Sequence, residues 1–183
     1  MEEKKSKLTI HMVASLDGFI SKENGDVSWL QSKDVYEGGI PLTDEYILEF
    51  LEGIDGYLMG SHTYEHALEL GWPYGDKPVY VMTKRELDST RDTVFFRKGD
   101  LQNVVEKELK SQFSRIWMAG GPRLTKELLQ QKLADELVVS YMPIILGQGR
   151  LFFDYIGEEQ QLHLKDVKAF KDGMVELTYD ILT

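Results

Sequence analysis

The sequence predicts a single α/β domain with a mostly parallel central sheet, helices on both faces and a C-terminal antiparallel hairpin. Short apolar runs alternate with segments of helical periodicity, which is typical of a parallel sheet covered by helices. The last two strand-like runs are joined through Lys171-Asp172-Gly173, a hairpin-type turn. With 183 residues, 42% hydrophobic content and no evident linker, residues 1–183 are expected to form one domain around one core, with residues 1–6 frayed.

The elements are expected in the following order. An opening strand at 7–14 precedes a long loop at 21–42, whose Gly, Asp, Ser and Lys content is typical of a lid or binding loop. Thr43 has the hydroxyl of a helix N-cap, and apolar residues follow it at helical spacing. Further helices are expected at 61–70, 100–111 and 122–132. Strands are expected at 56–60, 79–83, 94–96, 116–118, 137–142, 161–169 and 174–181.

The composition limits the partners of the protein. The absence of cysteine excludes disulfides and thiolate zinc sites. Together with the lack of a signal-like or membrane-length apolar run, it favours a cytoplasmic location. A net charge of -10, from 31 Asp and Glu against 21 Lys and Arg, argues against nucleic acid or an anionic membrane as partner and favours a small molecule. A phosphorylated cofactor would need local cations, for which Lys84, Arg85 and Arg123 are candidates.

One segment has the pattern of a phosphate-binding turn. The apolar strand at 116–118 continues into Ala119, Gly120 and Gly121, and a helix then starts with Pro122. Glycines let a backbone approach a ligand closely, and a helix N-terminus presents free amides at the positive end of the helix dipole. The pattern predicts an anion site, although a glycine pair can also simply turn a strand into a helix.

Two further strand ends carry similar chemistry. A second apolar strand stops at Gly60 and is followed by Ser61, His62 and Thr63 at the start of a helix. A third strand ends in the hydroxyl and two cations of Thr83-Lys84-Arg85. Because ligands collect at the carboxyl ends of strands in open α/β sheets, these three loops are expected to face one crevice.

Four motifs run in order along nearly the whole chain: Ser15-Leu-Asp-Gly-Phe-Ile, Leu58-Met-Gly-Ser-His-Thr-Tyr-Glu, Met118-Ala-Gly-Gly-Pro-Arg-Leu, and Asp135-Glu-Leu with Pro143-Ile-Ile-Leu-Gly-Gln-Gly-Arg-Leu-Phe. By these motifs the sequence resembles the dihydrofolate-reductase-like superfamily and, within it, a stand-alone bacterial member of the riboflavin-biosynthesis reductase group (RibD C-terminal domain type). The resemblance implies hydride transfer from NADPH to a pyrimidine- or pteridine-type substrate, as in 5-amino-6-(5-phosphoribosylamino)uracil reductase or dihydrofolate reductase. The deaminase of bifunctional riboflavin enzymes needs cysteines that this chain lacks, so the chain would be a reductase module alone.

The resemblance also implies where NADPH binds. The implied contacts lie at the three strand ends and near the first motif, at Ala14, Ile20, Gly60, Ser61, His62, Thr63, Thr83, Lys84, Arg85, Ala119, Gly120, Gly121, Pro122, Arg123 and Leu124. By the same resemblance the Gly120-Gly121 peptide bond is expected to be cis.

A homodimer is expected to use part of the apolar stretch 137–153.

Two carboxylates are candidate catalytic groups. Asp17 alone is typical of a turn before Gly18, but the resemblance places it beside the nicotinamide and the lid loop, in a positioning role. Asp44 is typical of a first-turn acid, yet its spacing to Met59-Gly60 resembles the spacing from the substrate-binding acid of dihydrofolate reductases to their cofactor loop. Asp44 is therefore the candidate residue for recognising a pyrimidine-like ring through paired hydrogen bonds.

Two other functions remain open. The chain could be a nucleotide-binding module without turnover. The segment from His62 through Glu65 to His66 also matches H-x-x-E-H, the inverted zinc-peptidase pattern, although no third ligand is indicated; no metal site is therefore expected. His11 and His163 lie in strand-like runs and are interpreted as structural.

Overall fold

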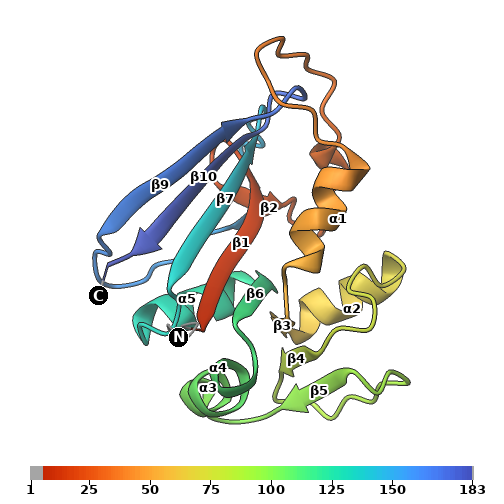
Figure 1. Ribbon diagram of the computed structural model, residues 1–183, viewed down its shortest axis with the longest axis vertical. Helices are drawn as coiled ribbons and strands as arrows, with labels where there is room; N and C mark the ends of the chain where they lie inside the picture. The colour runs from red at the N-terminus through yellow and green to blue at the C-terminus, as the bar shows by residue number, and fades with distance from the viewer. Residues whose placement is uncertain (1–5, 183) are drawn as a thin grey trace, which may run out of the picture.

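The computed structural model describes residues 6–182, and its central feature is an eight-stranded sheet with the order β5-β4-β3-β6-β1-β7-β10-β9 (Figure 1). β1, β3, β4, β5, β6 and β7 run parallel, whereas β10 is antiparallel to both β7 and β9. The predicted fold class is confirmed. The strands are β1 (Lys7–Ser15), β3 (Gly56–Gly60), β4 (Val79–Met82), β5 (Val94–Arg97), β6 (Arg115–Gly120), β7 (Glu136–Met142), β9 (Leu162–Ala169) and β10 (Val175–Ile181).

Helices cover both faces of the sheet, as predicted. α1 and α2 lie on one face, and α5 and the run of α3, η2 and α4 lie on the other (Figure 1). The helix expected at 100–111 is confirmed, but its middle part is π-helical. None of the described helices is long and apolar enough to cross a membrane. The helices are α1 (Asp44–Glu52), α2 (Ser61–Glu69), α3 (Leu101–Asn103), the π-helical η2 (Val104–Leu109), α4 (Lys110–Gln112) and α5 (Pro122–Gln130).

The two faces of the sheet pack into separate hydrophobic cores. In β3, Leu58 packs with Leu128 of α5 in one core, whereas its neighbours Tyr57 and Met59 pack with Tyr64 of α2 in the other. Successive side chains of a strand point to opposite faces, so a strand covered on both sides is apolar at every position. This explains why the sequence around Leu58 reads as a continuous apolar run.

Two short strands that the sequence did not predict form a second sheet. β2 (Phe19–Ser21) pairs antiparallel with β8 (Arg150–Leu151). Strands of 3 and 2 residues are too short to show a strand period, so only the tertiary structure reveals this pairing. It brings the segment that follows β1 against the segment that follows β7.

The loop expected at 21–42 is anchored to the hairpin turn between β9 and β10. Within the loop, the 3₁₀ helix η1 (Ser28–Leu30) buries Trp29. Ile40 forms an isolated bridge with Phe170, and the Tyr36 amide donates to the Lys171 carbonyl at 2.8 Å. The loop interpreted as a lid is thus held in this structure at its C-terminal half.

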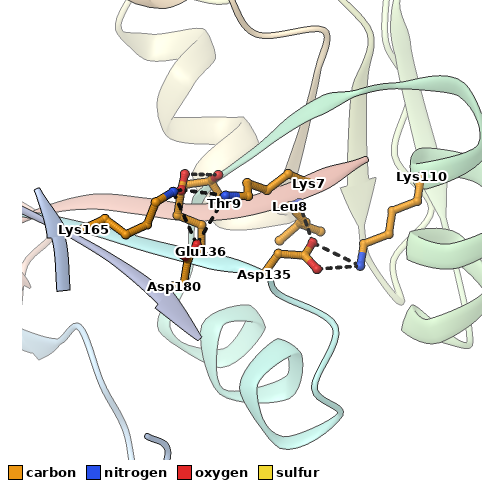
Figure 2. Close-up of polar contacts among 8 residues, drawn as sticks. All are labelled: Lys7, Leu8, Thr9, Lys110, Asp135, Glu136, Lys165 and Asp180. Carbon is orange, nitrogen blue, oxygen red and sulfur yellow. Dashed lines mark hydrogen bonds and ion pairs between the residues drawn. The ribbon is translucent and has the colours of Figure 1, made fainter. Parts of the chain in front are cut away.

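A polar network fixes the start of β1 against β7, β9 and β10, and Figure 2 shows its members. Lys7 and Lys165 both contact Glu136 and Asp180, with Lys165 Nζ 2.7 Å from Glu136 Oε2. Burial opposes ionisation of Glu136, but hydrogen bonds from Lys165 and Lys7 hold the pKa of this carboxyl below its usual value. The network lies at the amino ends of the parallel strands, away from the edge where ligands collect.

The first described residue is also held in place. The Ser6 hydroxyl donates a hydrogen bond of 2.6 Å to the carbonyl of Phe113. Fraying of residues 1–6 is therefore wrong at Ser6, because this bond ties it to the segment before β6. Residues 1–5 lie outside the described part of the chain.

Candidate functional site

The predicted loops lie at one edge of the sheet. Because β1, β3, β4 and β6 are parallel neighbours or next neighbours, their carboxyl ends at Ser15, Gly60, Met82 and Gly120 share this edge. From β3 the chain continues through α2 to β4 on one side, whereas from β6 it continues through α5 to β7 on the other. The strand order therefore reverses between β3 and β6, which is where open α/β sheets form their ligand crevice.

Two helices begin at this reversal without a side-chain cap. Gly60 is the N-cap of α2 and Gly121 is the N-cap of α5, and neither supplies a capping hydrogen bond from a side chain. Pro122 occupies the first turn of α5, as predicted. The first amides of both helices remain available to an anion, whose negative charge both helix dipoles favour.

The glycine pair joins these two helix starts. A Cβ atom built on Gly120 would lie 3.1 Å from both Cγ2 and Oγ1 of Thr63 in α2. No peptide bond between residues 6 and 182 is cis, so the expected cis bond between Gly120 and Gly121 is wrong. The chain turns instead through the positive φ angles of Gly120 (153°) and Gly121 (109°), which glycine adopts without a Cβ clash.

The candidate cations around the site are exposed, and the two arginines form surface ion pairs. Arg85 Nη2 lies 2.9 Å from Glu65 Oε2, and Arg123 Nε lies 2.9 Å from Glu127 Oε1. Lys84 is exposed beside Arg85 at the end of β4. Exposed ion pairs contribute only about 0–1 kcal/mol, so a phosphate can compete for such guanidinium groups.

The H-x-x-E-H segment is arranged differently from a zinc site. His62 Nδ1 lies 3.6 Å from Glu65 Oε2, and the same carboxylate oxygen pairs with Arg85. The hydrogen bond from Arg85 lowers the pKa of Glu65. Within residues 6–182 no three potential ligands gather in metal-binding geometry, so the geometry does not favour the zinc hydrolase.

Asp17 connects the turn after β1 to the loop after β7 through hydrogen bonds. Its carboxylate accepts hydrogen bonds from the Ser15 hydroxyl at 2.7 Å and from the amides of Leu146 and Gly147 at 3.1 and 2.8 Å. The Ser15 hydrogen bond is the main reason why the pKa of Asp17 lies below its usual value. This geometry makes Asp17 suited to positioning a loop.

The remaining predicted residues are placed as follows. Asp44 is the first residue of α1 and is exposed. The side chains of Ala14 and Leu124 are buried in the core, with Ile20 packed against it, so contacts from Ala14 and Leu124 to a ligand would use backbone atoms. The Thr83 hydroxyl accepts a hydrogen bond from the Arg85 amide at 3.0 Å, which leaves its proton free to donate.

The structure reveals a polar row beneath α1 that the sequence analysis missed. Ser140 of β7 donates to Glu176 Oε2 of β10 at 3.1 Å, and His11 Nε2 of β1 lies 3.2 Å from Ser140 Oγ. Lys168 of β9 donates to the hydroxyl of Tyr46 in α1 at 3.0 Å. The available signal is a polar residue at an inward position of the largely apolar strands β1 and β7, namely His11 and Ser140. The interpretation of His11 as structural does not reveal its contact with Ser140.

The His11 ring is neutral near pH 7. Burial is the main cause and lowers its pKa to about 4, although Glu176 Oε2 lies 3.6 Å from Nε2. The carboxylate would favour the charged ring, but the ring is enclosed by Trp117 and Phe50, so desolvation outweighs this attraction. His11 Nδ1 is buried without a hydrogen-bond partner.

The open sheet, with a strand-order reversal between two helix starts whose N-caps are glycines, defines an α/β protein with an arrangement that is typical of nucleotide-binding folds. Within that class the chain belongs to the RibD C-terminal domain family, whose family model matches residues 6–176. The family resemblance of the four sequence motifs is thereby confirmed.

Three proteins are similar to this chain in sequence or in fold. The chain is 31% identical over 175 residues to the uncharacterized protein YwjB of Bacillus subtilis (strain 168), covering 94% of this chain and 97% of that protein. A crystal structure of a candidate riboflavin biosynthesis protein from Shewanella sp. PV-4 matches with a TM-score of 0.82 and 25% identity, over 97% of this chain and 99% of that one. A deaminase/5-amino-6-(5-phosphoribosylamino)uracil reductase from Thermotoga maritima has the same fold, with a TM-score of 0.67 and 18% identity, over 98% of this chain and 57% of that one.

Proposed function

We propose that the protein is an NADPH-dependent reductase that acts on a pyrimidine- or pteridine-type substrate, most like 5-amino-6-(5-phosphoribosylamino)uracil reductase. The contact of Gly120 with Thr63 carries the proposal, because it brings two uncapped helix starts together at the strand-order reversal. Membership of the RibD C-terminal domain family supports the reductase class. A cytoplasmic location of this reductase remains a prediction from composition.

The residues at the edge of the sheet fit a phosphorylated dinucleotide. The first amides of α2 and the amides of Arg123 and Leu124 in α5, where Pro122 has no N–H, can hold a diphosphate. Glycine at position 120 keeps the space against Thr63 free of a side chain. Lys84 and Arg85 at the end of the neighbouring β4 supply local positive charge in a chain whose net charge is -10. A phosphate on the adenosine ribose would explain two adjacent cations there.

The chain would contribute positioning to the reaction. NADPH supplies the hydride when it is bound. Asp17 links the turn after β1 to the amides of Leu146 and Gly147 by hydrogen bonds. The backbone at the end of β1, at Ala14 and Ser15, is thereby held in one position against the two reactants. Fixed orientation of two reactants can contribute several kcal/mol to a rate enhancement, of order 7 or more in favourable cases.

The proposal is tested by NADPH oxidation followed at 340 nm. The substrates are 5-amino-6-(5-phosphoribosylamino)uracil, dihydrofolate and a panel of aldehydes and imines. We expect catalysed oxidation with the pyrimidine compound. Tight NADPH binding without oxidation by any substrate would instead establish a nucleotide-binding module without turnover, and stoichiometric zinc with hydrolase activity would establish the third alternative.

A further inference from the structure

The two faces of β1 are covered to different extents. On the α5 side, Leu8 and Ile10 are 0% exposed. On the α1 side, the side chain of His11 is 11% exposed and Val13 is also not fully buried, although β1 lies in the interior of the sheet between β6 and β7. α1 buries none of its own 9 residues. The helix therefore covers this face incompletely.

The incompletely covered face carries a row of polar residues. Val13, Ser140, Glu176 and Lys168 are aligned across β1, β7, β10 and β9, so their side chains share the α1 face. Ser140 is 1% exposed and the Glu176 side chain 14% exposed. Burying a carboxylate under a helix disfavours folding unless it is paired. Apolar residues would pack better here, which suggests that the row serves recognition.

The hydrogen-bond directions leave an acceptor free. Ser140 uses its proton to donate to Glu176 Oε2, so its oxygen accepts from His11 Nε2. Within residues 6–182 the other oxygen, Glu176 Oε1, forms no hydrogen bond with a side chain, and Lys168 Nζ lies 3.7 Å from it, beyond hydrogen-bonding distance. Ser140, together with the neutral His11 ring, thus orients Glu176 and satisfies one of its oxygens. The second carboxylate oxygen can accept a hydrogen bond from a ligand.

The surroundings of Glu176 match a flat heterocycle. A free carboxylate oxygen accepts strongly from an N–H group, such as a ring N–H or an exocyclic amine. The Lys168 ammonium lies 3.7 Å from Glu176 Oε1 and donates to the Tyr46 hydroxyl, and both Lys168 and Tyr46 can donate to ring carbonyl oxygens. Val13 and Tyr46 both pack against the buried cluster of Trp29, Met142, Phe170 and Met174 and are the apolar part of this surface. Val13 also directly precedes Ala14, so the row lies beside the predicted cofactor edge.

We propose that Glu176, oriented by Ser140 and His11 beneath α1, is the specificity-determining carboxylate that recognises the amino-substituted pyrimidine ring of the substrate. The proposal deepens the reductase function and rests on it for the substrate class. It competes with Asp44, which lies exposed at the start of α1. Glu176 is better placed because it is already oriented by a hydrogen bond, whereas a fully exposed carboxylate is bound by water.

The test uses isothermal titration calorimetry with 5,6-diaminouracil in the presence of saturating NADPH, and with uracil, which lacks the exocyclic amine. Glu176→Gln should weaken diaminouracil binding at least tenfold and leave weak uracil binding unchanged. Glu176→Asp, which keeps a shorter carboxylate, should retain part of the affinity. Glu159→Gln, at an exposed carboxylate in the segment before β9, is the matched control and should bind as the wild type does.

The outcomes separate this inference from the reductase function. Unchanged binding to Glu176→Gln, loss of binding with Asp44→Asn instead, or no binding of diaminouracil to the wild type would each overturn the assignment. Titration with NADPH alone tests the proposed function separately, and its affinity should be the same in the wild type and Glu176→Gln. If NADPH fails to bind while diaminouracil binding depends on Glu176, the reductase function fails and the ring site stands. Equal unfolding temperatures show that the variants are folded.

Discussion

Thr63, in the first turn of α2, lies directly against Gly120 at the end of β6, so that a Cβ atom on the glycine would be 3.1 Å from the threonine hydroxyl. This contact links the starts of α2 and α5 across the strand-order reversal. Any side chain at Gly120 must push the two helix starts apart or enter the space where a diphosphate would lie. The proposed cofactor site should therefore be sensitive to the addition of a single methyl group at Gly120.

Gly120→Ala should lower NADPH affinity by more than tenfold, at least about 1.4 kcal/mol, because the methyl group meets Thr63. Strain at a positive φ adds a stability cost of about 1–3 kcal/mol. Fluorescence titration measures affinity, and thermal unfolding measures stability. Gly99→Ala is the matched control, since Gly99 also has a positive φ but no neighbour within 4 Å; it should lose stability and keep its affinity. Normal NADPH binding by folded Gly120→Ala would reduce the glycine pair to an ordinary turn.

Lys84 and Arg85 should decide the choice between NADPH and NADH. Replacing both by alanine should weaken NADPH binding and leave NADH binding nearly unchanged, because only NADPH carries the extra phosphate. Arg85 must break its ion pair with Glu65 to bind this phosphate. Because salt screens the attraction between exposed charges, the loss of NADPH affinity in the double variant should be smaller at high salt. Titration of both cofactors against the wild type, the double variant and the exposed control Lys98→Ala provides the comparison. Equal affinities of the wild type for the two cofactors would contradict the assignment.

Lys77 should be important for the stability of α1. Its ammonium donates to the carbonyls of Leu51 at 2.7 Å and Glu52 at 3.0 Å, and also to that of Ile54, so it satisfies the C-terminal end of a helix that buries no residue of its own. Lys77→Met should lower the free energy of unfolding by about 1–3 kcal/mol. Urea denaturation measures the loss, and Lys22→Met, which breaks one exposed pair with Asp26, should change it by about 0.5 kcal/mol or less. Equal losses in the two variants would refute a special role for Lys77.

His11 should make the folded state sensitive to mild acid. Its pKa is about 4 in the folded protein and about 6.5 when unfolded. Between these values the unfolded chain binds a proton that the folded chain does not, so stability falls as the pH falls from about 6.5 to 4 and the loss then levels off. The loss should reach at most about 3 kcal/mol. His11→Gln cannot titrate, and its unfolding free energy at pH 7, 6 and 5 should fall less steeply; an unchanged slope would exclude His11 as the cause.

A homodimer should form through the exposed part of the stretch 137–153. The structure buries Leu137 and Phe152 inside the monomer, so much of the apolar character that predicted a dimer belongs to the core. Ile145 and Leu151 remain 71% and 46% exposed and are the candidate contacts. Light scattering at micromolar concentration should give twice the mass of 21.1 kDa, and Ile145→Asp should shift the mass toward the monomer. A monomeric wild type would rule out the dimer.

The sequence by itself determined the elements and the chemistry at the strand ends. Alternation of apolar runs with helical periodicity marked the parallel sheet, because local side-chain periods depend only on neighbours along the chain. Gly60, Gly121 and Pro122 marked the two helix starts for the same local reason. Family membership followed from motifs that keep their order along the chain.

Only the tertiary structure decided which of these local features meet. The contact of Thr63 with Gly120 and the row from His11 to Glu176 join residues far apart in sequence through strand order and register, neither of which a local period encodes. The trans bond at Gly120 and the pairing of β2 with β8 likewise depend on long-range packing. Burial of His11 beneath Phe50 and Trp117 is also a property of the assembled fold, and it changes the ring from an ordinary strand residue into a neutral partner of Ser140.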